Sequence, residues 1–194
     1  MTETAKALKY LDYFSLLTVG RSKVPNFTWT PQQIEKLSKD EFVKRYNYKG
    51  GTFKKNNQEI PATENIGLIT GFDFLEVIDI DLKVFSTAKE KIDFWNEYLG
   101  FLKDNILDFE EKFVIYKTKN EGYHILYKSK RVQSNLKLAK LKGHKEAVIE
   151  TRGRFGYVFA YPHNKVSKNG YFDVKFISDE DREILIQFSK SYNY

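Results

Sequence analysis

The stretch Phe74-Leu75-Glu76-Val77-Ile78-Asp79-Ile80-Asp81 decides the fold of this chain. Its short apolar run predicts a buried β-strand. Successive side chains of a strand point to opposite faces, so Asp79 and Asp81 share one face while Ile78 and Ile80 fill the other. Two carboxylates beside Val77 on an apolar strand carry a high desolvation cost unless a cation compensates them.

A hard divalent cation such as Mg²⁺ or Mn²⁺ prefers carboxylate oxygen, so this strand predicts a metal site. The alternative is that the strand ends near Asp79 and leaves solvated acids at its tip. Asp73 and Glu76 are close in sequence but do not share the paired setting, and we assign neither to the site.

The residues before this strand predict helices and one further strand. We expect an opening helix flanked by Leu8, Leu11, Ser15 and Thr18, and a loop or loose hairpin over residues 49–61. Residues 66–71 predict a strand that a tight turn joins to the central one. Two more helix starts follow from capping patterns, at Thr30-Pro31-Gln32-Gln33 and at Ser38-Lys39-Asp40-Glu41.

The residues after it alternate between helix and strand. A capping box at Thr87-Ala88-Lys89-Glu90 opens a helix with one buried stripe. Strands are expected at residues 113–116 and 123–127, a strand pair at 147–150 and 157–161 around Gly153 and Gly156, and a closing helix at 179–188 capped by Ser178. This order predicts an α/β (α+β) fold. The expected stripe consists of Ile92, Trp95, Leu99, Leu102 and Ile106.

Composition excludes several kinds of protein. The chain has 194 residues, of which 41% are hydrophobic, and this fits a globular protein rather than a disordered one. The absence of cysteine excludes disulfides, thiolate zinc sites and cysteine nucleophiles. Residues 1–10 hold no signal-peptide core and no stretch approaches a membrane span, so we expect a cytoplasmic protein with no membrane partner.

Positive charge is unevenly distributed. Lys and Arg number 32 against 26 Asp and Glu, and residues 128–145 contain basic side chains without a single acid. Such a cluster is typical of a surface that binds a polyanion, or of a solubilising surface, and charge alone leaves both open. The basic residues are Lys128, Lys130, Arg131, Lys137, Lys140, Lys142 and Lys145.

Glu150 and His124 extend the candidate site. Glu150 ends an apolar run and supplies a third carboxylate, although a lone acid at a strand end is usually a surface residue. His124 follows a polar segment, residues 118–122, whose backbone donors could reach a phosphate; alone, it fits a half-buried strand histidine equally well. The spacing of His124, His144 and His163 does not fit a zinc site.

Three motifs in this order resemble the archaeo-eukaryotic primase superfamily, specifically the primase-polymerase domains of phages, plasmids and other mobile elements. They are Val77-Ile78-Asp79-Ile80-Asp81, Gly122-Tyr123-His124 and Val148-Ile149-Glu150. Residues 20–25 and 65–71 add similarity before them. Arg152-Gly153, Gly156-Tyr157-Val158 and Pro162 add it after them, so the resemblance covers about residues 8–175.

The resemblance implies a DNA primase/polymerase, a nucleotidyltransferase in which Asp79, Asp81 and Glu150 bind two Mg²⁺ or Mn²⁺ ions. His124 would contact the triphosphate. Its partners would be a single-stranded DNA template, tracked by residues 128–145, a primer, NTPs or dNTPs, and a replicative helicase in the same or a separate chain. Further candidates for phosphate binding are Lys119, Arg152, Thr118, Arg21 and Lys23.

The implied fold is an RRM-like sheet joined to a smaller N-terminal α/β lobe. We expect one catalytic domain over residues 1–194, with an N-terminal helical part to about residue 65, a sheet core at 66–175 and a closing helix at 176–194. Glu121 departs from the family pattern, and beside a triphosphate its charge would be unfavourable, so we expect it to point away or the phosphate contacts to differ.

Two other functions remain open at this point. Asp79 with Glu150-Thr151-Arg152 loosely resembles the active site of a divalent-metal nuclease, although arginine replaces the usual lysine and Asp81 is then unexplained. A non-catalytic module that stacks single-stranded bases on its aromatic strands is the second alternative. A relaxase is disfavoured because its paired histidines are missing.

Overall fold

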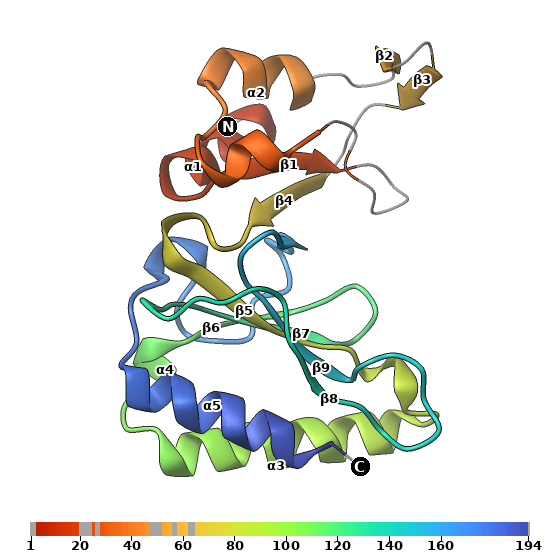
Figure 1. Cartoon of the computed structure of the whole chain (residues 1–194), viewed down its shortest axis with the longest axis vertical. Coiled ribbons are helices and arrows are strands. Elements are labelled where there is room, and N and C mark those ends of the chain that lie inside the picture. Colours follow the sequence, from red (N-terminus) through yellow and green to blue (C-terminus); the bar gives the residue numbers. More distant parts are fainter. Residues whose placement is uncertain are drawn as a thin grey trace.

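A computed structural model of the chain describes residues 3–19, 25, 28–46, 52–55, 58–61 and 65–193. Within these residues, helices and antiparallel strands form an α+β fold, as predicted from the sequence (Figure 1). The strands build a five-stranded sheet, a three-stranded sheet and a two-stranded hairpin.

The five-stranded sheet contains β5, the strand that the sequence predicted around Asp79. Its order is β6-β7-β5-β9-β8, and every neighbouring pair is antiparallel. The strand rich in carboxylates, β5, therefore lies in the middle, where both of its edges are paired. The bounds are β5 Leu75–Ile80, β6 Val114–Lys117, β7 Tyr123–Lys128, β8 Lys137–Ala139 and β9 Ile149–Arg152.

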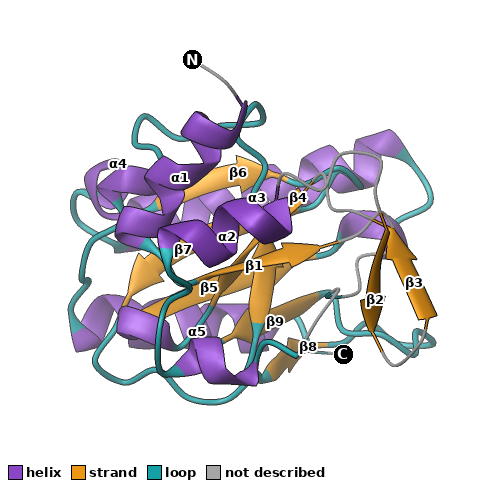
Figure 2. Ribbon diagram, turned by 90° about the horizontal axis from the view of Figure 1, so that it is seen from above, coloured by secondary structure: helices purple, strands orange, loops and turns teal. Residues whose placement is uncertain are grey.

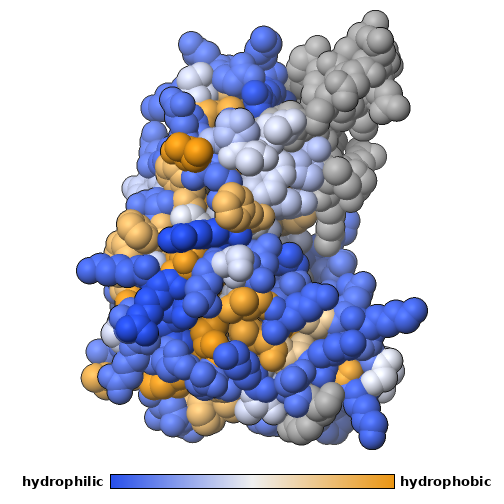
Figure 3. Space-filling model, in the orientation of Figure 1, coloured by the Kyte–Doolittle hydropathy of each residue, from blue (hydrophilic) through white to orange (hydrophobic). Residues whose placement is uncertain are grey.

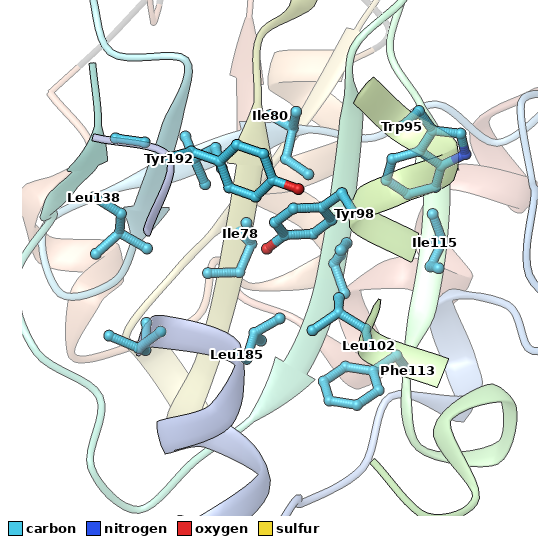
Figure 4. Close-up of a cluster of buried hydrophobic side chains, with 14 of the residues drawn as sticks. Ile78, Ile80, Trp95, Tyr98, Leu102, Phe113, Ile115, Leu138, Leu185 and Tyr192 are labelled. Carbon is cyan, nitrogen blue, oxygen red and sulfur yellow. The ribbon is translucent and has the colours of Figure 1, made fainter. Parts of the chain in front are cut away.

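Two helices, α3 (Ala88–Asn105) and α5 (Asp179–Ser191), cover one face of this sheet (Figure 1). Ile78 and Ile80 point into the core that the helices form with the sheet, as predicted (Figure 4). Both helices begin as predicted, because Thr87 forms a capping box with Glu90 and Ser178 accepts a hydrogen bond from the Asp181 backbone. A short helix, α4 (Phe109–Lys112), leads from α3 to β6.

The buried stripe of α3 differs from the prediction at its first position, and at its third position Leu99 is only half-buried beside the fully buried Tyr98. Ile92 is 57% exposed, whereas the stripe begins with Phe94 and Trp95 and continues through Tyr98 and Leu102. Ile92 instead borders a solvent-open recess beside Tyr123, at the edge where the first turns of α3 pass the end of the sheet.

The three-stranded sheet has the order β1-β4-β10 and is antiparallel. Helices α1 (Glu3–Tyr13) and α2 (Lys39–Tyr46) lie in the same layer, over the other face of the large sheet (Figure 2). A second core of Leu16, Phe42, Leu68, Val77 and Leu126 joins this layer to the large sheet. The strand bounds are β1 Leu16–Val19, β4 Asn65–Ile69 and β10 Tyr157–Phe159.

Two predictions about the N-terminal part of the chain are wrong. The opening helix ends at Tyr13, and Thr18 belongs to strand β1, because the buried run from Leu16 to Val19 pairs along β4. Thr30 does not cap a helix but lies inside a short 3₁₀ helix, Thr30–Gln33. The cap at Ser38 is present, and the hairpin β2 (Thr52–Lys55) and β3 (Gln58–Pro61) falls in the expected region.

The largest difference from the predictions concerns which strands pair with each other. The sequence suggested that β9 and β10 pair with each other, but β9 lies between β5 and β8 whereas β10 crosses to β4. In the same way β4 and β5 follow each other closely and still belong to different sheets. The segment from β4 to β5 and the segment from β9 to β10 lie side by side, and a hydrogen bond of 2.6 Å from Thr70 Oγ1 to the Gly153 carbonyl joins them.

Hydrophilic side chains cover most of the molecular face in Figure 3, and apolar atoms are visible mainly in the lower half, where the large sheet and its helices lie. In the part of the chain that the structure describes, no helix has the length and apolar character needed to cross a membrane.

Candidate active site

A row of five side-chain positions crosses the large sheet in register. Tyr116 on β6 faces His124 on β7, His124 faces Asp79 on β5, Asp79 faces Glu150 on β9, and Glu150 faces Lys137 on β8. Residues directly opposite each other on neighbouring strands share a face of the sheet. The structure therefore brings His124, Asp79 and Glu150 together, with Asp79 between the other two, although His124 stands between them in the sequence.

Gly122 makes the alignment of β7 with β5 possible. A Cβ atom at this position would lie 2.1 Å from the carbonyl oxygen of Ile80, so a side chain fits here only if the backbone shifts. The absence of a side chain lets the two strands approach at the end where the site lies, and it explains why glycine precedes Tyr123-His124.

Arg152 binds both carboxylates at the centre of the row. Its Nε donates a hydrogen bond to Asp79 Oδ2 at 3.1 Å, and its Nη2 donates one to Glu150 Oε1. His124 Nε2 lies 3.5 Å from Asp79 Oδ1. The other ring nitrogen of His124, Nδ1, is buried and has no hydrogen-bond partner within the described residues.

The pKa values of the two carboxyl groups are displaced in opposite directions. Burial raises the pKa of Asp79, but the hydrogen bond from His124 and the charges of His124 and Arg152 outweigh it, so the pKa is lowered. Burial also raises the pKa of Glu150, and the negative charges of Asp79 and Asp81 add to this rise, so the pKa stays above its ordinary value despite Arg152.

Asp81 lies one residue beyond the end of β5 rather than inside the strand. Its carboxylate accepts a hydrogen bond from the Lys83 backbone at 3.1 Å and pairs with the Lys83 ammonium at 2.9 Å. Lys83 in turn pairs with Glu146. Asp81 therefore borders the same pocket as Asp79, but a different cation balances its charge.

A pocket of about 320 Å³ opens beside this row. One part of its lining is charged or polar, and the other part is aromatic. Glu150 lies next to it in the sheet but outside its lining. The lining residues are Asp79, Ile80, Asp81, Thr118, Asn120, His124, Asn135, Arg152, Phe155, Gly156, Tyr157, Val158, Phe159 and Tyr161.

Not all of the other residues predicted to contact phosphate line the pocket. Thr118 lines the pocket, whereas Lys119 is exposed in the loop between β6 and β7. Arg21 and Lys23 lie outside the described residues. Glu121 points away from the pocket toward α3, where its carboxylate pairs with Lys91 at 2.7 Å, so its charge does not oppose an anion there.

The two acids that the sequence analysis left aside take no part in the site. Glu76 is fully buried on the opposite face of β5, where Arg182 binds it through two hydrogen bonds of 2.7 and 2.9 Å. Asp73 is paired with Lys128 at 2.5 Å. Both carboxylates are therefore explained by ion pairs elsewhere in the fold.

Two of the seven basic residues of the segment 128–145 form ion pairs with acids elsewhere in the fold. Lys128 pairs with Asp73, and Arg131 pairs with Asp179 at 2.8 Å. Lys137 lies at the end of the row, opposite Glu150, and is exposed. Of this segment, Lys137 is thus placed next to the carboxylates of the site.

Sequence reasoning missed the aromatic side of the pocket. Tyr157, Phe159 and Tyr161 line it from β10 and the residue pair that follows, at alternate positions of the chain. This period of two was visible in the sequence and is typical of one strand face. Phe155 precedes them in the same period of two but lies in the loop before β10, so its place in the lining depends on the shape of that loop.

The fold and the site define an α+β protein with a charged and aromatic pocket on the face of an antiparallel sheet. Residues 7–175 match the family described as bifunctional DNA primase/polymerase, N-terminal. The chain belongs to this family, which confirms the resemblance seen in the sequence and identifies a primase-polymerase domain, an enzyme of nucleotidyltransferase type. No curated protein sequence matches the chain.

Proposed function

We propose that this domain is a metal-dependent polymerase that transfers nucleotides from NTPs or dNTPs to a 3′-hydroxyl on a single-stranded DNA template. The observation that carries the proposal is the position of Asp79, in register between Glu150 and His124 and at the wall of the pocket. Two-metal nucleotidyl transfer needs carboxylates next to a site for a triphosphate, and the carboxylates beside this pocket support the proposal.

The donors fit a divalent cation in kind. Asp79, Asp81 and Glu150 offer hard carboxylate oxygens, and the pKa of Glu150 is raised by burial first and by the nearby negative charges of Asp79 and Asp81 second. In the described residues no three acid or histidine side chains form a ready set of metal ligands. The guanidinium of Arg152 holds two of the carboxylates, so binding of an ion requires that Arg152 turns away.

The side chains around the pocket have separate roles in this proposal. When bound, the divalent ions would activate the attacking hydroxyl and neutralise charge on the leaving pyrophosphate. Arg152, released from the carboxylates, reaches the phosphates, and His124 and Thr118 supply further hydrogen bonds. Lys119 and Lys23 stay candidates for the same function. Phosphate needs such donors because negative charge increases on the leaving group.

The test is extension of a labelled primer on a DNA template with dNTPs and Mn²⁺ or Mg²⁺. We expect extension by the wild-type protein and none by the Asp79→Ala/Asp81→Ala variant. Asp73→Ala is the matched control, because Asp73 is an acid of the same chain segment that is paired with Lys128 away from the pocket. This control should extend the primer at the wild-type rate.

Other outcomes reject the proposal in recognisable ways. Cleavage of the template without extension would identify a nuclease. Binding of single strands with neither reaction would identify a non-catalytic module. An unprimed template with NTPs or dNTPs, run in parallel, separates initiation of a strand from its extension and measures which sugar the protein prefers.

A further inference from the structure

Phe155 has an unusual backbone for its side chain. Its φ angle is 63°, in the left-handed region that aromatic residues rarely adopt, and its side chain is 66% exposed at the pocket. An exposed phenyl ring in a strained conformation gains little from burial, so its position calls for a reason outside the packing of the core.

The loop around Phe155 is held firmly by its neighbours. The Phe155 backbone N–H donates to Gln33 Oε1 at 3.2 Å, and the Gly153 N–H donates to Asn135 Oδ1 at 2.9 Å. The Arg154 N–H donates to the Gln133 carbonyl at 2.7 Å. A Cβ at Gly153 would lie 2.1 Å from that same carbonyl oxygen. Backbone strain persists where the surroundings over-determine it, and such positions are concentrated at functional sites.

The pocket into which this loop presents Phe155 has two chemically different parts. Asp79, Asp81 and Arg152 form the charged part, and the aromatic part continues from Phe155 to Tyr157, Phe159 and Tyr161. A nucleoside triphosphate has the same division, with an anionic chain at one end and a flat aromatic base at the other.

We propose that Phe155 stacks on the base of the incoming nucleotide and so positions the triphosphate at the carboxylates. This inference rests on the proposed polymerase function and adds a specific residue to it. Stacking on a phenyl ring is independent of base identity because every base has a π face, which suits an enzyme that copies all four bases. The fixed backbone of the loop presents the ring without a loss of backbone freedom on binding.

The test compares alanine variants of two exposed phenylalanines that have the same φ angle. Phe155→Ala removes the ring at the pocket. Phe74→Ala is the control, because Phe74 is also an exposed phenylalanine, at 48%, with a φ of 63°, but its ring packs against Phe176 away from the pocket. Binding of dATP, of inorganic tripolyphosphate and of a single-stranded oligonucleotide is measured separately by calorimetry with Mn²⁺, and the Km of primer extension is measured for dNTP.

We expect Phe155→Ala to weaken dATP binding, and to raise the Km for dNTP, by roughly 5- to 100-fold. Tripolyphosphate binding should be unchanged, since it has no base to stack. Phe155→Tyr, which keeps the ring, should bind dATP as the wild type does, and Phe74→Ala should be normal in every measurement.

Unchanged dATP affinity in Phe155→Ala would overturn the stacking role, while primer extension by the wild type would leave the proposed function intact. Equal losses for dATP and tripolyphosphate would overturn it as well, because they would indicate a disturbed loop. A loss confined to the oligonucleotide would assign the ring to a DNA strand instead. A wild-type protein that neither binds dATP nor extends a primer would reject the proposed function together with this inference.

Discussion

Asp79 and Glu150 lie directly opposite each other on β5 and β9, and one guanidinium, that of Arg152, binds both carboxylates. Asp79 has a second partner in His124, whereas Glu150 does not share it. This difference explains why the pKa of Asp79 is lowered and that of Glu150 is raised, although burial acts on both in the same direction.

Opposite pKa shifts predict opposite pH dependence for two conservative variants. The lowered pKa of Asp79 means that its ionised form favours the folded state. This contribution is present above the pKa of the unfolded chain and is lost as pH falls through the folded pKa. Asp79→Asn should therefore lower the free energy of unfolding at pH 7 and do so less in acid, as measured by urea unfolding without divalent ions over a pH series.

Glu150→Gln should behave in the reverse way. Because the pKa of Glu150 is raised in the folded state, its ionisation disfavours folding, and wild-type stability falls as pH rises through that pKa. The variant has no such charge and keeps an oxygen for Arg152, so relative to wild type it should gain stability toward pH 7. The same sign of pH dependence for both variants would contradict this account.

Arg152→Gln tests whether the guanidinium competes with a metal ion. Removing a cation that holds Asp79 and Glu150 through charge-assisted hydrogen bonds should tighten Mn²⁺ binding in the absence of nucleotide, by about tenfold. Arg152→Lys keeps the charge and should change Mn²⁺ affinity less. Paramagnetic resonance of free Mn²⁺ measures both. Weaker Mn²⁺ binding by Arg152→Gln would mean that the guanidinium orients the carboxylates rather than occupying the place of the ion.

Gly122→Ala should destabilise the protein because its methyl group would meet the Ile80 carbonyl at 2.1 Å. We expect a loss of about 1–3 kcal/mol in the free energy of unfolding, typical of overpacking. Gly100→Ala is the matched control, since a Cβ at Gly100, within α3, has no atom within 4 Å and alanine favours helix. The melting temperature should fall for Gly122→Ala and rise for Gly100→Ala. Equal shifts for the two variants would contradict the claim that the close approach of Gly122 to Ile80 requires glycine.

The buried ion pair of Glu76 and Arg182 links α5 to the large sheet, so breaking it should lower the free energy of unfolding. Arg182→Met leaves a carboxylate uncompensated at 0% exposure, which costs about 3–5 kcal/mol. The double variant Glu76→Gln/Arg182→Met should recover most of that loss. For comparison, Lys89→Ala breaks the exposed pair with Asp93 and should leave the stability measured by chemical denaturation nearly unchanged.

Local features of the fold were predictable from the sequence. The caps of α2, α3 and α5 were found because a capping side chain binds backbone groups within three residues of itself. The partners of β9 and β10 were not, because strand pairing joins distant segments and adjacency in sequence favoured the wrong choice. The exposure of Ile92 likewise depends on where the sheet ends, and helical periodicity does not contain that information.

The site divides in the same way. Strand alternation correctly put Asp79 on the face opposite Ile78 and Ile80. The resemblance grouped Asp79, His124 and Glu150, and the structure brings them side by side, but the sequence did not predict that β5 lies between the other two strands. The sequence suggested Arg152 as a phosphate contact and did not indicate that it binds the carboxylates, or that Lys83 balances Asp81. Both contacts depend on how long side chains fold back across the sheet, for which residue spacing is a poor guide.

The pairing of β10 with β4 also bears on how the protein is made. On the ribosome β1 and β4 emerge early, yet β4 lacks its second neighbour until Tyr157 to Phe159 have been synthesised. The N-terminal layer therefore completes its sheet after the strands of the large sheet exist, and the two mature together. A nascent chain stalled before Tyr157 leaves the edge of β4 open, and an open edge invites pairing with another copy.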